Sequence, residues 1–179
     1  SVRLSTSTNI YFNRPDHTKA PIEQSVRLCG EAGYRVMDMN FYDCTTFKLP
    51  FITEQWEKWI YGILETAQDS QIQFSQGHAN FYNFCDPDAE NKEFLDRMVL
   101  RSIDCASILG IPWLVIHAGT DFASPTLVRS SKEKNIEYFK PVLEYAKKRH
   151  VGIAIENLWD LNIAPLRRYT TTAEELVDL

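Results

Sequence analysis

Five short apolar segments recur along the chain at nearly even distances, and this spacing constrains the fold more than any other feature. Their ranges are 2–7, 34–40, 72–78, 113–119 and 152–157, and their centres lie 32, 38, 41 and 38 residues apart. Between them, apolar residues recur with helical periodicity over 53–70, 88–109 and 134–149. Nearly continuous apolar strands that alternate with helices indicate βα units and a parallel sheet.

An even period of about one βα unit favours an α/β fold of the (β/α)8 TIM-barrel type. A doubly wound sheet is the alternative, but no glycine-rich nucleotide-binding loop follows any predicted strand. A barrel needs about eight units and typically ~250 residues, whereas the chain has 179. We therefore expect residues 1–179 to form a partial TIM-barrel domain with about the first five βα units, truncated at the C-terminus.

Charge and composition argue against several classes of partner. A formal net charge of −5 at pH 7 gives no electrostatic reason to bind nucleic acid or an anionic membrane. No apolar stretch approaches the ~20 residues of a membrane span, and no signal-peptide pattern opens the chain, so we expect a cytoplasmic protein. The four cysteines lie far apart without a CxxC pair, which indicates ordinary thiols.

Four chemically active side chains end successive predicted strands. Asp38, His78, His117 and Glu156 are separated by 40, 39 and 39 residues. Catalytic groups of barrels lie at the carboxyl ends of strands, so these side chains should converge on one mouth. Two imidazoles and a carboxylate form a donor set that binds catalytic divalent metals. We therefore interpret Glu156, His117 and His78 as catalytic candidates.

Each of these residues also has a purely structural interpretation. A histidine at a strand end often hydrogen-bonds to the backbone of its loop, and Glu156 can cap the next helix or pair with Arg167 or Arg168. For Asp38, accepting backbone N–H groups of its own loop is a better explanation than metal ligation. The equal spacing favours the functional interpretation for the two histidines and the glutamate taken together.

The segments SQGHANFYNF, LGIPWLVIHAG and VGIAIENLWD resemble the xylose isomerase-like TIM-barrel superfamily. LSTSTN and GYRVMDMNFYD resemble its first two strands. The superfamily includes sugar and sugar-phosphate isomerases and epimerases, dehydratases, and endonuclease IV. The resemblance covers the N-terminal five βα units and is specific for the superfamily, not for the substrate.

This resemblance implies a metal-dependent sugar or sugar-phosphate isomerase or epimerase that moves a proton beside a carbonyl through a metal-stabilised enediolate. In that branch one divalent metal (Mn, Mg, Co or Zn) is held by a strand-five glutamate, matched by Glu156, and by an acid, a His and a Glu beyond Leu179. Glu156 would be both metal ligand and base, while His78 and His117 contact the substrate or lie outside the ligand shell. The expected substrate-binding residues are Asp38, Asn40, Asn157 and Trp159. The five-unit chain alone is expected to be inactive.

An endonuclease IV-like zinc phosphodiesterase is the main alternative, with His78, His117 and Glu156 all as zinc ligands. Bulky residues follow Asn157 where the nuclease members have small ones, and the acidic balance offers little for gripping phosphates. A related dehydratase and a non-catalytic fragment also remain open. The expected partner is a small sugar or polyol, with no nucleic acid and no membrane, and a homo-oligomer is left open.

Overall fold

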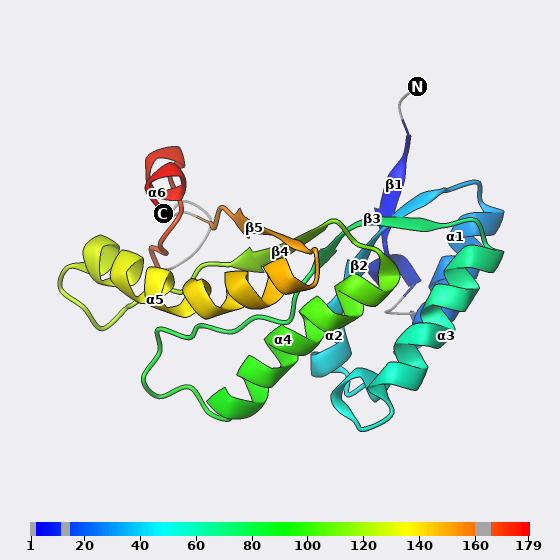
Figure 1. Cartoon of the computed structure of the whole chain (residues 1–179), viewed down its shortest axis with the longest axis horizontal. Coiled ribbons are helices and arrows are strands. Elements are labelled where there is room, and N and C mark those ends of the chain that lie inside the picture. Colours follow the sequence, from blue (N-terminus) through cyan, green and yellow to red (C-terminus); the bar gives the residue numbers. More distant parts are fainter. Residues whose placement is uncertain (1–2, 12–14, 160–165) are drawn as a thin grey trace.

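Five parallel strands form one sheet whose order follows the sequence, β1-β2-β3-β4-β5, in the computed structural model (Figure 1). The structure describes residues 3–11, 15–159 and 166–179. Within these ranges, each strand lies inside a predicted segment, and Val2 of the first segment lies outside them. The strands are β1 (Ser5–Ser7), β2 (Val36–Asn40), β3 (Gln73–His78), β4 (Trp113–His117) and β5 (Gly152–Glu156). An order without reversal has no topological switch point, which argues against the doubly wound alternative.

The main helices lie along one face of this sheet (Figure 1). Neighbouring helices contact one another in the series α1, α3, α4 and α5, as in the wall of a barrel. The helices are α1 (Ile22–Glu31), α2 (Phe41–Thr46), α3 (Trp56–Asp69), α4 (Lys92–Leu109), α5 (Leu127–Lys148) and α6 (Ala173–Asp178), with short 3₁₀ helices η1 (Thr8–Tyr11) and η2 (Pro50–Ile52).

Helix α5 begins at Leu127, earlier than the predicted start at residue 134, and Pro141 lies inside it. The buried residues of the first turns of α5, Ser131 in the missed segment and Asn135 just after the predicted start, are polar. Ser131 accepts a hydrogen bond from the backbone N–H of Asp121 at 2.9 Å, and Asn135 accepts one from Gly119 at 2.9 Å. Because these buried side chains are hydrophilic, apolar periodicity could not reveal the start of the helix.

Two helix ends match their sequence signals. Gly33 follows α1 with a positive φ of 94°, and the backbone N–H of Tyr34 reaches the carbonyl of Cys29 at 3.0 Å. This is the left-handed helix ending that glycine adopts without steric cost. At the start of α6, Thr172 and Glu175 form a capping box, which the spacing of a threonine and a glutamate three residues later indicates.

The two faces of the sheet differ in chemistry. Met37, Met39, Leu114 and Ile116 are buried in the core shared with the helices. The residues between them alternate to the opposite face.

A register shift between β2 and β3 decides which residues share that face. Met37 pairs with Phe74, but Asp38 pairs with Gln76, so Ser75 is the additional residue of a bulge. Without the bulge the parity of β3 would reverse and turn His78 towards the helices.

All four cysteines are buried free thiols, in line with the sequence expectation. No helix in the described ranges combines the length and the apolar character that a bilayer-spanning segment requires.

Candidate functional site

The predicted residues Asp38, His78, His117 and Glu156 form a diagonal row across β2, β3, β4 and β5. His117 pairs in register with Glu156, and His78 pairs with Val115, two residues before His117. Asp38 likewise lies two residues before Asn40, the register partner of His78. An offset of two residues keeps side chains on one face of a sheet, so the row converges at one edge.

Hydrogen bonds join the row in two pairs, and a longer contact links the pairs. Nε2 of His117 lies 2.9 Å from Oε2 of Glu156, and Nε2 of His78 lies 3.8 Å from the same oxygen. On its other side, Nδ1 of His78 lies 2.9 Å from Oδ2 of Asp38, which also accepts a hydrogen bond from Nε2 of Gln76 at 2.8 Å. Sequence reasoning missed Gln76, because an exposed-looking glutamine within a strand gives no signal until the bulge is known.

The two histidines have environments that separate their pKa values. The hydrogen bond to Asp38 raises the pKa of His78 above its ordinary value, against the opposing effect of burial. Burial lowers the pKa of His117, and the Glu156 carboxylate offsets this only in part. His78 is therefore the imidazole that holds a proton more readily, and a neutral His117 can donate its Nε2–H to Glu156.

Exposure distinguishes the carboxylate that a ligand can reach from the one that it cannot. The side chain of Glu156 is 41% exposed, whereas that of Asp38 is 10% exposed. Asp38 accepts from the side chains of His78 and Gln76 instead of the loop N–H groups that the structural interpretation expected. It therefore orients His78, while Glu156 faces the open side of the row.

The donor chemistry of the row fits a divalent metal only in part. A carboxylate oxygen and imidazole nitrogens are suitable ligands, and a carboxylate on Nδ1 is the usual partner of a metal-binding histidine. Among the residues that the structure describes, however, no group of three or more His, Cys, Asp or Glu side chains is arranged to hold a metal ion. Glu156 and its neighbours thus offer some ligands of a metal site, not a complete set.

The other predicted site residues, Asn40, Asn157 and Trp159, lie in different surroundings. Asn40 is the N-cap of α2, and its side chain accepts a hydrogen bond from the backbone N–H of Asp43 at 3.2 Å. Asn157 is exposed. Trp159 is 64% exposed, and its ring lies 5.9 Å from the guanidinium carbon of Arg168.

The ion pair suggested between Glu156 and Arg167 is wrong, because Arg167 pairs with Glu175. Among described residues, no ion pair joins Glu156 to Arg168 either.

An aromatic wall adjoins the row. The ring centroid of Phe81 lies 3.8 Å from that of His117. The ring of Tyr42 stacks on Phe81, with 4.7 Å between the ring centroids. Beside His117 these rings border a pocket of about 300 Å³. We call it the aromatic pocket and define it by Tyr42, Phe81, Phe122, Leu158 and Arg168.

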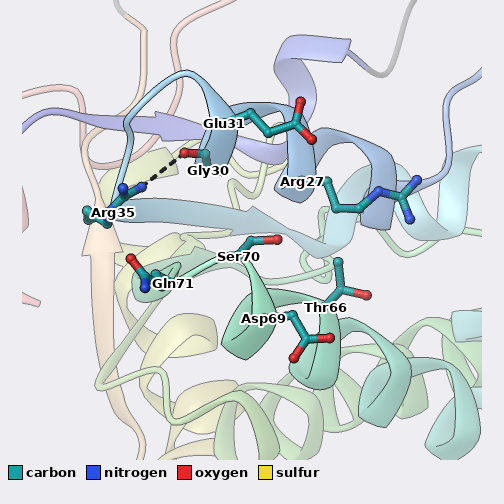
Figure 2. Close-up of a pocket in the computed structure, with 8 residues that line it drawn as sticks. All are labelled: Arg27, Gly30, Glu31, Arg35, Thr66, Asp69, Ser70 and Gln71. Carbon is teal, nitrogen blue, oxygen red and sulfur yellow. Dashed lines mark hydrogen bonds between the residues drawn. The ribbon is translucent and has the colours of Figure 1, made fainter.

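A larger hollow of about 490 Å³ lies between the carboxyl-terminal ends of α1 and α3 (Figure 2). Helices that follow parallel strands end at the amino edge of the sheet, so this hollow lies opposite Glu156. Nη1 of Arg35 donates to the carbonyls of Gly30 at 3.0 Å and Tyr34 at 2.6 Å. A Cβ on Gly30 would lie 2.7 Å from the carbonyl oxygen of Ser70, so the chain segments meet closely here. We assign this hollow a structural role.

Comparison with known proteins identifies the family to which the fold belongs. The family model of the xylose isomerase-like TIM barrel matches residues 26–179. A comparison with curated proteins finds no significant match.

Solved structures with the same fold include several named as epimerases. A D-tagatose 3-epimerase-like protein has 15% identity and a TM-score of 0.72, covering 99% of this chain and 59% of its own. A D-psicose 3-epimerase structure with D-fructose has 13% identity and a TM-score of 0.63, covering 88% and 53%. An AP endonuclease, family 2, from Brucella melitensis has 14% identity and a TM-score of 0.65, covering 98% and 62%. The chain thus spans little more than half the length of these proteins.

The family match and the five parallel strands confirm the expected fold class, in which the sheet represents the first βα units of a TIM barrel. The chain belongs to the xylose isomerase-like TIM barrel family.

Proposed function

We propose that the protein is a metal-dependent sugar or sugar-phosphate isomerase or epimerase that moves a proton on the carbon beside a carbonyl. The observation that carries the proposal is the accessible Glu156 carboxylate at a strand end, hydrogen-bonded to His117. The substrate class follows the names of neighbours such as the D-tagatose 3-epimerase-like protein. Because the chain spans 59% of that neighbour, the activity is proposed for the full-length protein.

Glu156 would act as the base and as one metal ligand. The carboxylate would take the proton from the substrate carbon. The Nε2–H of His117 orients this carboxylate through the 2.9 Å contact between Nε2 and Oε2 of Glu156. His78 holds a proton more readily because of Asp38, so it can donate to the oxygen on which negative charge develops. A bound divalent ion would supply Lewis-acid polarisation of the substrate carbonyl. The wall of Phe81 and Tyr42 would keep water from the reacting carbon.

The zinc phosphodiesterase alternative has one observation in its favour: Nε2 of His78 and Nε2 of His117 both face Oε2 of Glu156. Imidazole and carboxylate are donor types that zinc takes, although among the described residues these side chains are not arranged as a complete ligand set. The net charge of −5 weighs against it, because a nucleic-acid backbone requires positive charge. The metal content of the full-length protein separates the two functions.

The test uses the full-length protein, freed of metal with EDTA and reloaded with Mn²⁺, Co²⁺ or Zn²⁺. We expect one metal equivalent by elemental analysis, and deuterium uptake from D₂O into D-tagatose, D-fructose or D-fructose 6-phosphate by NMR. Glu156→Gln should slow this uptake at least about 100-fold, since an amide cannot accept the proton. It should also weaken metal binding.

Glu31→Gln is the matched control, because it makes the same change on an exposed carboxylate of the opposite hollow. Uptake that survives Glu156→Gln unchanged would contradict the proposal. Two or three zinc equivalents without any deuterium uptake would favour the phosphodiesterase.

A further inference from the structure

The aromatic pocket is continuous with the candidate site through His117. Its volume of about 300 Å³ lies at the lower end of the range for small-molecule sites, roughly 300–1,000 Å³. His117 lines this pocket, and its Nε2 faces Glu156. A substrate whose reacting carbon lies at Glu156 can therefore extend a substituent into the pocket.

The two residues that follow Arg168 are fixed by hydrogen bonds to two other segments of the chain. The backbone N–H of Tyr169 donates to Oγ1 of Thr120 at 2.9 Å, and the ring of Tyr169 is fully buried. The carbonyl of Thr170 accepts a hydrogen bond from the N–H of Leu158 at 3.0 Å. These contacts anchor the backbone beside Arg168 to the segments that follow β4 and β5, which reduces the entropy that a ligand would have to overcome.

Among the described residues, the guanidinium of Arg168 has no hydrogen-bond or ion-pair partner, although the residue is half-buried. Its Nε is buried and has no hydrogen-bond partner among the described residues. No ion pair of Arg168 is found in that part of the chain, although the adjacent Arg167 pairs with Glu175. Its described contact is the face of Trp159 at 5.9 Å. Leaving a buried donor of a charged group unpaired costs free energy. Arg168 also lines the aromatic pocket, and no described anion offsets its charge there.

The surroundings favour an anionic acceptor over a hydroxyl. Tyr42, Phe81 and Phe122 border the pocket, and electrostatic attraction is stronger beside such low-polarity walls than in water. The carboxylate of Glu156 faces His117 and forms no ion pair with Arg168 among the described residues. Arginine binds phosphate and carboxylate oxygens in a planar, bidentate geometry.

The arginines of the opposite hollow differ in this respect. Arg27 and Arg35 are exposed to water, and Arg35 already donates to two backbone carbonyls.

We infer that the aromatic pocket binds an anionic group of the substrate, a phosphate or a carboxylate, through Arg168. This inference rests on the proposed function, because it places the anion on the molecule that reacts at Glu156. It narrows the substrate class from sugars in general to sugars that carry a phosphate or a carboxylate.

The test compares matched neutral and anionic probes by isothermal titration calorimetry on the metal-free full-length protein. The pairs are D-fructose with D-fructose 6-phosphate, and D-glucose with D-glucuronate. We expect the anionic member of one pair to bind at least about tenfold more tightly, as for a charge-assisted hydrogen bond. Preference in the first pair assigns a phosphate, and preference in the second assigns a carboxylate. Equal binding within both pairs would overturn the inference.

Arg168→Gln should abolish this preference, and Arg129→Gln should keep it. Arg129 is a suitable control for net charge because its side chain is 82% exposed and pairs only with its helix neighbour Glu133 among the described residues. If Arg168→Gln fails to fold by circular dichroism, Arg168→Lys replaces it, with at least a threefold loss expected because the planar fork is gone. A preference that survives the folded Arg168 variant would also overturn the inference.

Failure of this inference and failure of the proposed function give different results. The anion preference is a binding measurement without metal, whereas the proposed function is tested by metal-dependent deuterium uptake. Uptake without anion preference leaves Glu156 in its role and removes Arg168. Anion preference without uptake leaves Arg168 in its role and removes the proton transfer.

Discussion

The two edges of the sheet both carry charged side chains, but they hold them in different ways. At the amino edge, Arg27, Glu31 and Asp69 are exposed around the hollow between α1 and α3 (Figure 2). At the carboxyl edge, the charged groups stand on strands, are partly buried and bond to one another's side chains. Retaining titratable groups in such surroundings costs free energy, so their mutual contacts indicate function more strongly than exposed charge does.

If the functional site were chosen by the volume of the space alone, the amino edge would be preferred. The amino-edge hollow measures about 490 Å³ and the aromatic pocket about 300 Å³. The larger space is surrounded by exposed helix ends, and its best-connected charge, Arg35, satisfies backbone carbonyls. The partners of the charged groups are therefore more informative about function than the volume of the space.

Among changes that leave Glu156 itself intact, the largest expected effect comes from removing the charge that orients His78. Asp38→Asn should lower metal affinity and deuterium uptake by roughly 10–100-fold, as for other residues that position a metal-site histidine. The melting temperature should change little, because the amide oxygen can still accept from His78. Calorimetric metal titration and NMR exchange measure the two functional effects.

Asp69→Asn is the matched change at the amino edge, where the carboxylate is exposed. It should alter neither quantity. Equal losses in the two variants would remove the distinction between the edges.

The spacing of the strands and of the row could be predicted from the sequence because one βα unit repeats at a nearly constant length. Asp38, His78, His117 and Glu156 are recognisable by residue type and by their place at the end of apolar segments. The bulge at Ser75 could not be predicted, since it depends on pairing with a strand far away in the sequence. Gln76 was missed for the same reason.

Other features could not be predicted because the residues that form them are polar and give no apolar periodicity. The first turns of α5 bury Ser131 and Asn135, which resemble solvent-facing residues when read along the chain. Asn40 was interpreted as a substrate contact, but the structure shows that it also caps α2. Arg168 carried no signal beyond a surface charge, because its position depends on the contacts of Tyr169 and Thr170 with segments distant in the sequence.

The amino edge should respond to changes in packing and not to changes in chemistry. Gly30→Ala should destabilise the protein by about 1–3 kcal/mol, because the new Cβ would meet the backbone oxygen of Ser70 at 2.7 Å. Gly62→Ala in α3 is the control: nothing lies within 4 Å of its new Cβ, and alanine favours the helix by about 0.5–1 kcal/mol. Urea unfolding measures both. Equal stability changes in the two variants would show that the close approach at Gly30 does not matter.

A charged cluster at the carboxyl edge provides a further test, because we assign it a structural role despite its place. Asp121 follows β4 and accepts from Lys134 at 2.8 Å and from Ser130 at 2.5 Å, which lowers the pKa of its carboxyl. A lowered pKa in the folded state stabilises the protein above the ordinary pKa of Asp, and this contribution is lost as the pH falls through the lowered value.

The melting temperature should therefore drop more steeply between about pH 5 and pH 3 in the wild type than in Asp121→Asn. Parallel profiles would show that the cluster does not stabilise the fold. A loss of deuterium uptake at neutral pH in a well-folded Asp121→Asn would instead extend the functional row to this loop.

The smallest effect is expected for Arg35, the residue that connects α1 to β2 across the hollow. Arg35→Ala removes hydrogen bonds to the carbonyls of Gly30 and Tyr34 and should cost about 0.5–1 kcal/mol of stability, since these partners can turn to water. Arg27→Ala removes an exposed charge from the same hollow and should stay within about 0.5 kcal/mol of the wild type. Urea unfolding resolves the difference, and deuterium uptake per folded molecule should equal that of the wild type in both. Reduced uptake in either variant would mean that the amino edge contributes to the chemistry, and the contrast between the two edges would fail.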